Sequence, residues 1–212
     1  MTTVLKILES LDHEDGLDVG KLEKTLKITK KFDKVNLNIA IKALTKLGII
    51  QNIIDDKLTL NNEIDFLQGR VRCSSKGYCF VVREDQGEDI YIRENNLNNA
   101  WHGDLVLVLI TKQGVKRRAP EGKIQCVLQR YNETLLAKVE PDKLTEKLKA
   151  YPLDDRIPVT IEIENDSQSN KKYPDKDFIH EIKINKYPIA QFKAQGSIVK
   201  ELSLNSGVEG DI

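Results

Sequence analysis

The spacing of apolar residues changes along the chain from a helical period to a strand period. In the first 48 residues apolar positions recur every three or four residues, which predicts helices over 3–11, over 18–26 and from Asp33 to Gly48. Asp33 is expected to cap the third helix, and Gly48 to end it in a left-handed conformation. The runs 49–54 and 57–60 then predict two short strands around an acidic turn. Three helices followed by a hairpin indicate a winged helix-turn-helix domain over residues 1–64.

The third helix of a winged helix can read duplex nucleic acid in the major groove. Its expected outer side here is polar and partly basic, with Lys30, Lys31, Lys34, Asn36, Asn38, Lys42 and Lys46. Residues 1–64 nevertheless carry no net charge, and winged helices also serve as adaptors between proteins. Binding of structured RNA or DNA and docking of a protein therefore both stay open for this domain.

After residue 62 the pattern alternates with the period of two that is typical of strands. Five candidate strands, 68–73, 78–83, 89–93, 104–111 and 122–130, predict a small barrel of the OB type over residues 65–131. A fainter second set, 135–139, 147–153, 159–164, 178–184 and 197–202, predicts another barrel over 132–212, which we expect to be truncated on its C-terminal side. Residues 165–176 are polar and predict an exposed loop. The expected fold class is thus α+β, mainly β.

Charge points to the middle third of the chain. The whole chain is neutral, but seven of its eight arginines lie in residues 65–131, which have a net charge of +3, against 0 before and −3 after them. Arginine suits phosphate contacts because its planar fork can bind two oxygens at once. An arginine-bearing but merely solvated surface is the alternative.

Three aromatic side chains within this segment form a candidate platform for stacking bases. Tyr78 and Phe80 are two residues apart on one predicted strand, and Tyr91 lies on the next. Stacked bases on such a platform contribute about 1 to 3 kcal/mol each. Aromatic residues of strands more often fill a core, but that arrangement would turn the apolar neighbours at 79, 81, 90 and 92 toward water. We therefore expect the aromatics to face outward, with Arg70 and Arg72 beside them.

The remaining reactive side chains indicate neither a metal site nor a membrane segment. Cys73, Cys79 and Cys126 lack metal-ligand spacing and are expected to be buried thiols in a reducing cytoplasm. The three histidines are far apart in the sequence, and no apolar run approaches the roughly 20 residues needed to cross a bilayer. The acids Asp154, Asp155, Asp175 and Asp177 are taken as loop residues.

Several stretches resemble a known family. Residues 76–81 (KGYCFV) and 89–92 (DIYI) resemble the two ribonucleoprotein motifs of the cold-shock domain. Residues 99–106 resemble the A-x-x-G-D-x-V signature, and residues 121–130 the closing E-G-x-V…R strand, of the bacterial ribonuclease R and ribonuclease II exoribonucleases. The order of a winged helix and two cold-shock-like barrels also resembles the N-terminal part of these enzymes.

The resemblance implies that this chain binds single-stranded RNA and delivers it to a processive 3′-5′ exoribonuclease domain. It implies base stacking by Tyr78, Phe80 and Tyr91, phosphate contacts by Lys76 and Arg72, and a turn shaped by Gly103 and Asp104. Arg70 and Arg93 are also expected to bind RNA, although Arg93 stands where the family has a histidine; the second barrel lacks an aromatic pair. Magnesium belongs to the family's later catalytic domain, so the chain alone is expected to be inactive and to need no cofactor.

Two further hypotheses compete with this one. The chain could act as a stand-alone cold-shock-type module, an RNA chaperone or regulator without an attached nuclease. Alternatively, the winged helix could dock protein partners.

Overall fold

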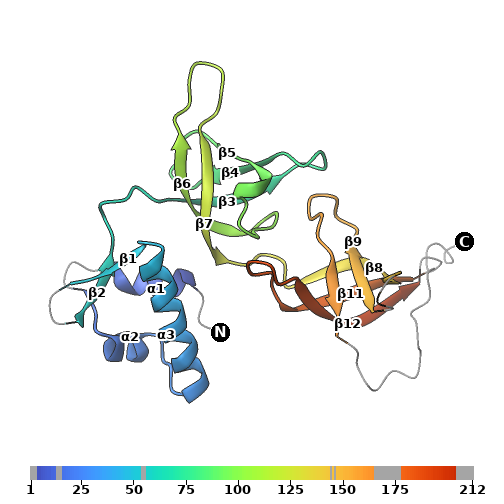
Figure 1. Ribbon diagram of the computed structural model, residues 1–212, viewed down its shortest axis with the longest axis horizontal. Helices are drawn as coiled ribbons and strands as arrows, with labels where there is room; N and C mark the ends of the chain where they lie inside the picture. Colours follow the sequence, from blue (N-terminus) through green and yellow to red (C-terminus); the bar gives the residue numbers. More distant parts are fainter. Residues whose placement is uncertain are drawn as a thin grey trace, which may run out of the picture.

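A computed structural model describes residues 4–12, 16–53, 56–143, 145, 147–164 and 178–203. It confirms the predicted fold class, because three helices and a hairpin precede two closed barrels of five strands each. Figure 1 shows the helices, the first barrel and the second barrel as three bodies in chain order. No helix in the described part of the chain has the length and apolar character needed to cross a membrane.

The first body is the predicted helical domain. Its elements are α1 (Val4–Leu11), α2 (Val19–Thr25), α3 (Lys31–Lys46), β1 (Ile50–Asn52) and β2 (Leu58–Leu60), with β1 and β2 antiparallel. Asp18 caps α2 by accepting a hydrogen bond of 2.9 Å from the amide of Lys21. Gly48 ends α3 as predicted, with a φ of +71°, and the next amide, that of Ile49, donates to the carbonyl of Leu44.

The predicted start of α3 was wrong by two residues. The helix begins at Lys31, after a cap position, Lys30, whose side chain makes no capping hydrogen bond, and Asp33 lies in the first turn. A carboxylate is favourable both as a cap and within the first turn, where it faces the positive end of the helix dipole. Its presence alone therefore does not fix the first residue of the helix.

The two barrels have the same strand order. The first contains β3 (Leu67–Cys73), β4 (Cys79–Arg83), β5 (Ile90–Ile92), β6 (Leu105–Lys112) and β7 (Glu121–Gln129), with the short helix η2 (Glu94–Asn96) after β5. The second contains β8 (Thr134–Pro141), β9 (Leu148–Pro152), β10 (Ile161–Ile163), β11 (Phe178–Lys186) and β12 (Ala194–Ser203). Neighbours follow the order β3-β4-β5-β7-β6 in one and β8-β9-β10-β12-β11 in the other. Each strand corresponds to a predicted one; the loop predicted at 165–176 lies outside the described residues.

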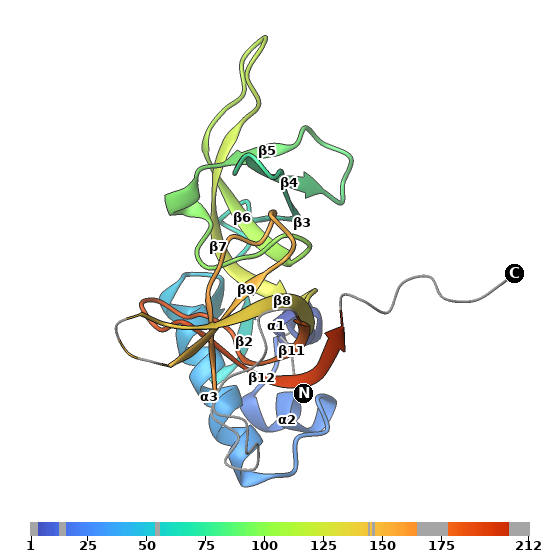
Figure 2. The same cartoon turned by 90° about the vertical axis from the view of Figure 1, so that its right-hand side faces the viewer.

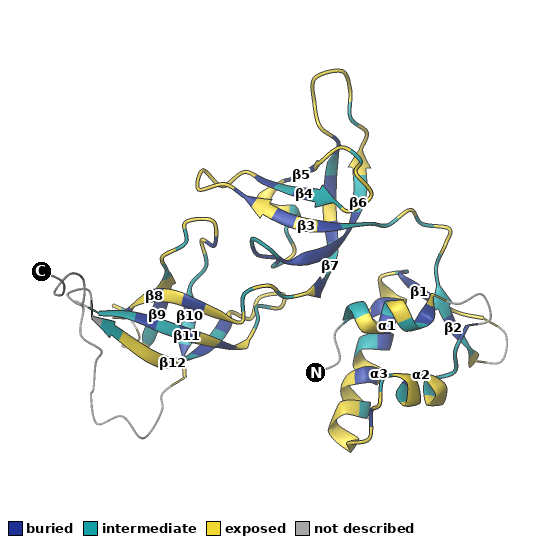
Figure 3. Ribbon diagram, turned by 180° about the vertical axis from the view of Figure 1, so that it is seen from behind, coloured by how far each residue is buried: buried dark blue, intermediate teal, exposed yellow. Residues whose placement is uncertain are grey.

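The first barrel connects the other two bodies. Its residues Leu105, Leu107 and Leu128 belong to the buried cluster of the helical domain, and α1 lies against β7. Trp101, from the turn before β6, belongs to the buried cluster of the second barrel. Figure 3 shows buried positions alternating with exposed ones along β3 and β8, whereas the first four residues of β6 are all buried because Leu105 and Leu107 pack against the helical domain. The domain boundaries at 64 and 131, and the truncation of the last domain, stay predictions.

A buried ion pair lies where the two barrels meet. The fully buried carboxylate of Asp104 accepts hydrogen bonds from the amides of Trp101 (2.8 Å) and Tyr131 (3.0 Å) and from Nη1 of Arg130 (2.8 Å). The Arg130 guanidinium lies 4.6 Å from the ring centre of Tyr187 in the second barrel and 5.7 Å from that of Trp101. Burial lowers the pKa of Arg130, and the charge of Asp104 opposes that shift.

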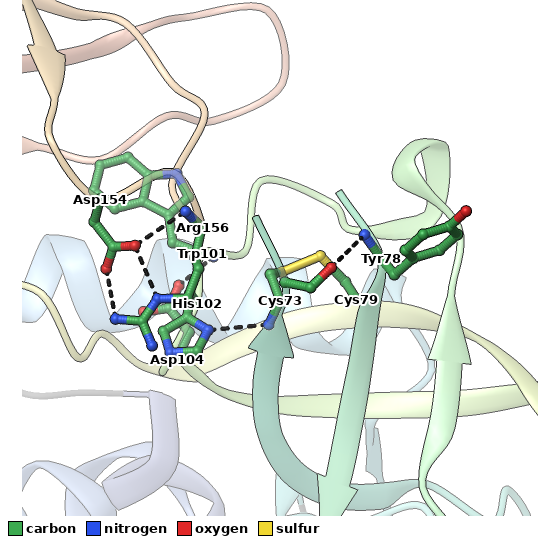
Figure 4. The surroundings of a disulfide bond; sticks show 9 residues. Cys73, Tyr78, Cys79, Trp101, His102, Asp104, Asp154 and Arg156 are labelled. Atoms are coloured by element: carbon green, nitrogen blue, oxygen red, sulfur yellow. Dashed lines mark hydrogen bonds and ion pairs between the residues drawn. A yellow bond between two sulfur atoms is a disulfide. The ribbon is translucent and has the colours of Figure 1, made fainter. Parts of the chain in front are cut away.

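The expectation of three buried thiols was wrong for two of the cysteines. Cys73 and Cys79 form a disulfide, with Cα atoms 4.0 Å apart, because the turn between β3 and β4 brings them directly opposite each other (Figure 4). Cys126 on β7 is free and partly buried, and burial raises the pKa of its thiol to about 12.

A thiol titration should therefore count a different number of reactive thiols in the folded chain, in the unfolded chain and in the unfolded, reduced chain. Because the reactive species is the thiolate, we expect no reaction of the folded chain with dithiobisnitrobenzoate at pH 8 when it is purified without reductant. Unfolding should expose one thiol, from Cys126, and reduction of the unfolded chain should raise the count to three. Three thiols in unfolded, unreduced protein would show that Cys73 and Cys79 are not bonded.

Candidate nucleic-acid interface

A row of four side chains crosses the outer face of the first barrel. Arg72 on β3 is paired with Phe80 on β4, Phe80 with Tyr91 on β5, and Tyr91 with Glu121 on β7. The rings of Phe80 and Tyr91 have centroids 5.4 Å apart and are inclined by 54°. We refer to these four residues as the outer row.

Strand alternation explains why this row faces outward. The neighbours Cys79, Val81, Ile90 and Ile92 are all buried in the barrel core, whereas Phe80 and Tyr91 are only partly buried. Tyr78 is 57% exposed and lies just before β4, where its amide donates to the hydroxyl of Ser74. Figure 4 shows the Tyr78 ring directed away from the disulfide. The three aromatics thus have the outward placement that the sequence predicts; their contact with bases stays a prediction.

The four cations that are predicted to bind RNA differ in the ion pairs and hydrogen bonds that their side chains form within the protein. Arg93 forms an ion pair of 2.9 Å with Glu121, and Arg70 donates to the carbonyl of Gly103. Arg72 and Lys76 are exposed and form no ion pair with another described residue. Arg72 and Lys76 are therefore the two cations that are most free to contact phosphate, and they lie at the β3 side of the outer row.

The hairpin between β6 and β7 adds a basic feature that was not singled out from the sequence. An isolated bridge between Val115 and Arg118 closes its tip, on which Lys116, Arg117 and Arg118 are all exposed. The hairpin projects away from the barrel both in Figure 1 and in the perpendicular view of Figure 2. Three consecutive cations in a predicted turn were the signal that could have identified it.

The second barrel has charged residues where the first has aromatics. The parallel pairings of β5 with β7 and of β10 with β12 place Gly122 and Gly196 at equivalent positions, where an added Cβ would collide with an isoleucine of the core. From this register the counterparts of the outer row are Glu140, Lys149, Glu162 and Gln195. The side chain of Lys149 forms an ion pair with that of Asp142, and the hydrogen bond between them raises the pKa of the lysine. The face equivalent to the aromatic platform is thus occupied by paired charges.

The predicted loop acids form no metal centre in the described part of the chain. Asp154 binds the guanidinium of Arg156 through both carboxylate oxygens, at 2.8 Å each, and this pairing lowers the pKa of the carboxyl. Asp175 and Asp177 lie outside the described residues. No three His, Cys, Asp or Glu side chains of the described segments come together in a way that could hold a metal ion.

Two family models match the first two bodies. The model described as "Cyanobacterial RNase R, N-terminal domain" matches residues 5–61, and "Ribonuclease B OB domain" matches residues 69–127. The Acetazolamide conferring resistance protein zam of a Synechocystis strain is 37% identical over 200 residues, covering 93% of this chain and 25% of that protein. Ribonuclease R of Buchnera aphidicola is 24% identical, covering 92% and 26%. The chain therefore spans about a quarter of the length of these relatives.

Solved structures share the fold. Mycoplasma genitalium RNase R in complex with ribose-methylated single-stranded RNA has a TM-score of 0.56 at 20% identity, covering 66% of this chain and 22% of that one. Yeast Ssd1, described as a pseudonuclease, has a TM-score of 0.52 at 19% identity, covering 77% and 24%. These structures support the arrangement of helices and barrels.

Proposed function

Since this chain is an N-terminal region of the ribonuclease R type, we propose that it binds single-stranded RNA on the outer face of its first barrel. The observation that carries the proposal is the outer row, in which two adjacent aromatic rings lie beside the exposed cation Arg72. Rings of this kind stack on bases of any sequence, and cations beside them neutralise the backbone. The related structure from Mycoplasma genitalium holds single-stranded RNA, which agrees with the proposal.

We further propose that the bound strand is delivered to a magnesium-dependent 3′-5′ exoribonuclease domain, and that this takes place in the cytoplasm. The described residues offer no ligand set for a metal, so they do not fit the family's magnesium and are assigned no hydrolytic step. Their own contribution is to hold the strand. The second barrel, with its paired charges, would guide the strand without stacking its bases.

A second candidate function is RNA binding without an attached nuclease. It is favoured by the similarity of the fold to that of a protein described as a pseudonuclease. Both candidates require RNA binding by this chain, and they differ in whether RNA is shortened by the protein to which the chain belongs.

Fluorescence anisotropy with a labelled single-stranded RNA of about 16 nucleotides tests the proposal directly. We expect log K to fall with log salt at a slope between about −2 and −4, because each neutralised phosphate of a single strand contributes about −0.7. The chain should leave the RNA at its original length during incubation with magnesium. Absence of salt-sensitive binding would contradict the proposed function, whereas shortening of the RNA would show that these residues do contain a nuclease.

A variant of the basic hairpin between β6 and β7 can be compared with the original chain in the same experiment. Replacing Lys116, Arg117 and Arg118 by serine should make the slope less steep by about 2 for the longer RNA. Binding of an oligonucleotide of about 6 residues, which is long enough to cover the outer row, should change less than binding of the longer RNA. Equal losses for both lengths would indicate a general effect of charge rather than a path along the hairpin.

A further inference from the structure

The solvent-facing side of α3 carries large apolar side chains. Phe32 is 73% exposed, Val35 50% and Ile39 59%, and their spacing of three and four residues puts them on one stripe of the helix. The opposite side is buried in the domain through Leu37, Ile41 and Leu44. A helix that is apolar on both sides is typical of one that is covered on both sides. We refer to Phe32, Val35 and Ile39 as the outer stripe.

The outer stripe has a lysine rim. Lys31 lies four residues before Val35, and Lys42 and Lys46 follow Ile39 by three and seven residues, so all three are directed to the same side of the helix. Each of these lysines is exposed. The acid of α3, Asp33, falls on a different side by the helical period. By the helical period Lys31 and Lys42 lie along one edge of the stripe and Lys46 lies beyond Ile39, so the surface combines an apolar row with positive charge beside it.

This surface does not suit the reading of duplex nucleic acid by α3. Base edges are recognised through hydrogen bonds from side chains such as Arg, Asn and Gln at the centre of the helix face, where α3 has the outer stripe. Of the lysines expected to face outward, Lys34 is held by Glu23 of α2. Figure 3 shows α3 standing clear of both barrels, so neither covers the stripe.

The positive charge of the lysines decides between two kinds of partner that could cover the outer stripe, a second copy of the chain and a helix of another protein. A second copy of the chain would place the lysines of one α3 against those of the other, which is repulsive. An amphipathic helix of a partner would meet the stripe with apolar residues at positions i, i+3 and i+7. Acidic residues beside them would meet the lysine rim.

We propose that the outer stripe of α3 is a docking site for an acidic amphipathic helix of a partner protein. Apolar side chains of that helix cover Phe32, Val35 and Ile39, and its carboxylates pair with Lys31, Lys42 and Lys46. This surface is separate from the RNA-binding row, because it lies in the helical domain and involves no residue of either barrel. The site can therefore be occupied while RNA is bound.

Selection from a library of helical peptides displayed on phage, with the whole chain as bait, tests this proposal. The library is first depleted on the F32S/I39S variant. We expect the enriched peptides to share the i, i+3, i+7 apolar pattern with flanking Asp or Glu, and a synthetic copy to bind F32S/I39S at least tenfold more weakly. The variant should fold normally, because both side chains are exposed.

Two matched variants make the result specific. I189S/F192S removes two equally exposed apolar side chains, 69% and 67%, from the tip of the hairpin between β11 and β12, and should bind the peptide like the original chain. K42E/K46E should lose the acidic peptide and gain a version in which lysine replaces its acids. The proposal would be overturned if no peptide is enriched, if I189S/F192S loses peptide binding as much as F32S/I39S does, or if the outer stripe binds only vesicles of anionic phosphatidylglycerol.

Discussion

The double variant Y78A/F80A should bind single-stranded RNA at least about thirtyfold more weakly than the original chain. Each aromatic side chain that stacks on a base contributes about 1 to 3 kcal/mol, and two of them therefore account for a factor of about thirty or more. Tyr78 is 57% exposed and Phe80 lies on the barrel surface beside Tyr91, so both rings are accessible to a strand. Fluorescence anisotropy at constant salt measures the change.

A tyrosine of the second barrel provides the matched control for that experiment. Tyr151 is 42% exposed and lies on β9, where it is paired with Lys138 of β8. Tyr151 therefore has the position in the second barrel that Val82 has in the first. The variant Y151A should bind RNA within about twofold of the original chain, and F80Y, which keeps a ring, should retain most of the affinity. Thermal unfolding identifies any variant that has lost its fold. Unchanged RNA binding by folded Y78A/F80A, or an equal loss in Y151A, would refute the assignment of the platform.

The inward and outward sides of the barrel strands could be predicted because they depend on local alternation. Val81 and Ile90 are fully buried and the neighbouring Phe80 and Tyr91 face outward, as the period of two requires. The end of α3 at Gly48 was equally predictable, since a glycine with positive φ is a frequent helix terminator. These features need no information about distant parts of the chain.

Features that depend on contacts between segments could not be predicted in this way. The disulfide requires the register that puts Cys73 opposite Cys79, which cysteine spacing alone does not reveal. The stacking of Arg130 on Tyr187 joins two barrels through residues that are far apart in the sequence. The outer side of α3 was expected to be polar and partly basic, and this was wrong for Phe32, Val35 and Ile39, which are exposed there because the core side of the helix is already complete without them.

The second large effect is expected at the joint between the barrels. Asp104 is fully buried and is held by two amides and by Arg130. Replacing it with alanine leaves the mostly buried guanidinium of Arg130 without its carboxylate, with the carbonyl of Asn99 as its remaining hydrogen-bond acceptor; removing one partner of a buried ion pair typically costs about 3 to 5 kcal/mol. We expect thermal unfolding to shift downward by about 10 °C, since 1 kcal/mol corresponds to roughly 2 to 4 °C in a chain of this size.

Two further variants provide comparisons for D104A. The amides of Trp101 and Tyr131 donate to different oxygens of Asp104, so the single oxygen of D104N can accept from only one of them and its NH2 group faces the other; D104N should therefore be destabilised nearly as much as D104A. D154A breaks an exposed pair with Arg156 and should change stability by less than about 1 kcal/mol, because solvent screens such pairs. The joint itself is monitored by limited proteolysis between the barrels, which should become faster in D104A well below its unfolding temperature. Equal stability of D104A and D154A would mean that the buried pair contributes no more than the exposed one, and that hydrophobic packing around Trp101 holds the barrels together without it.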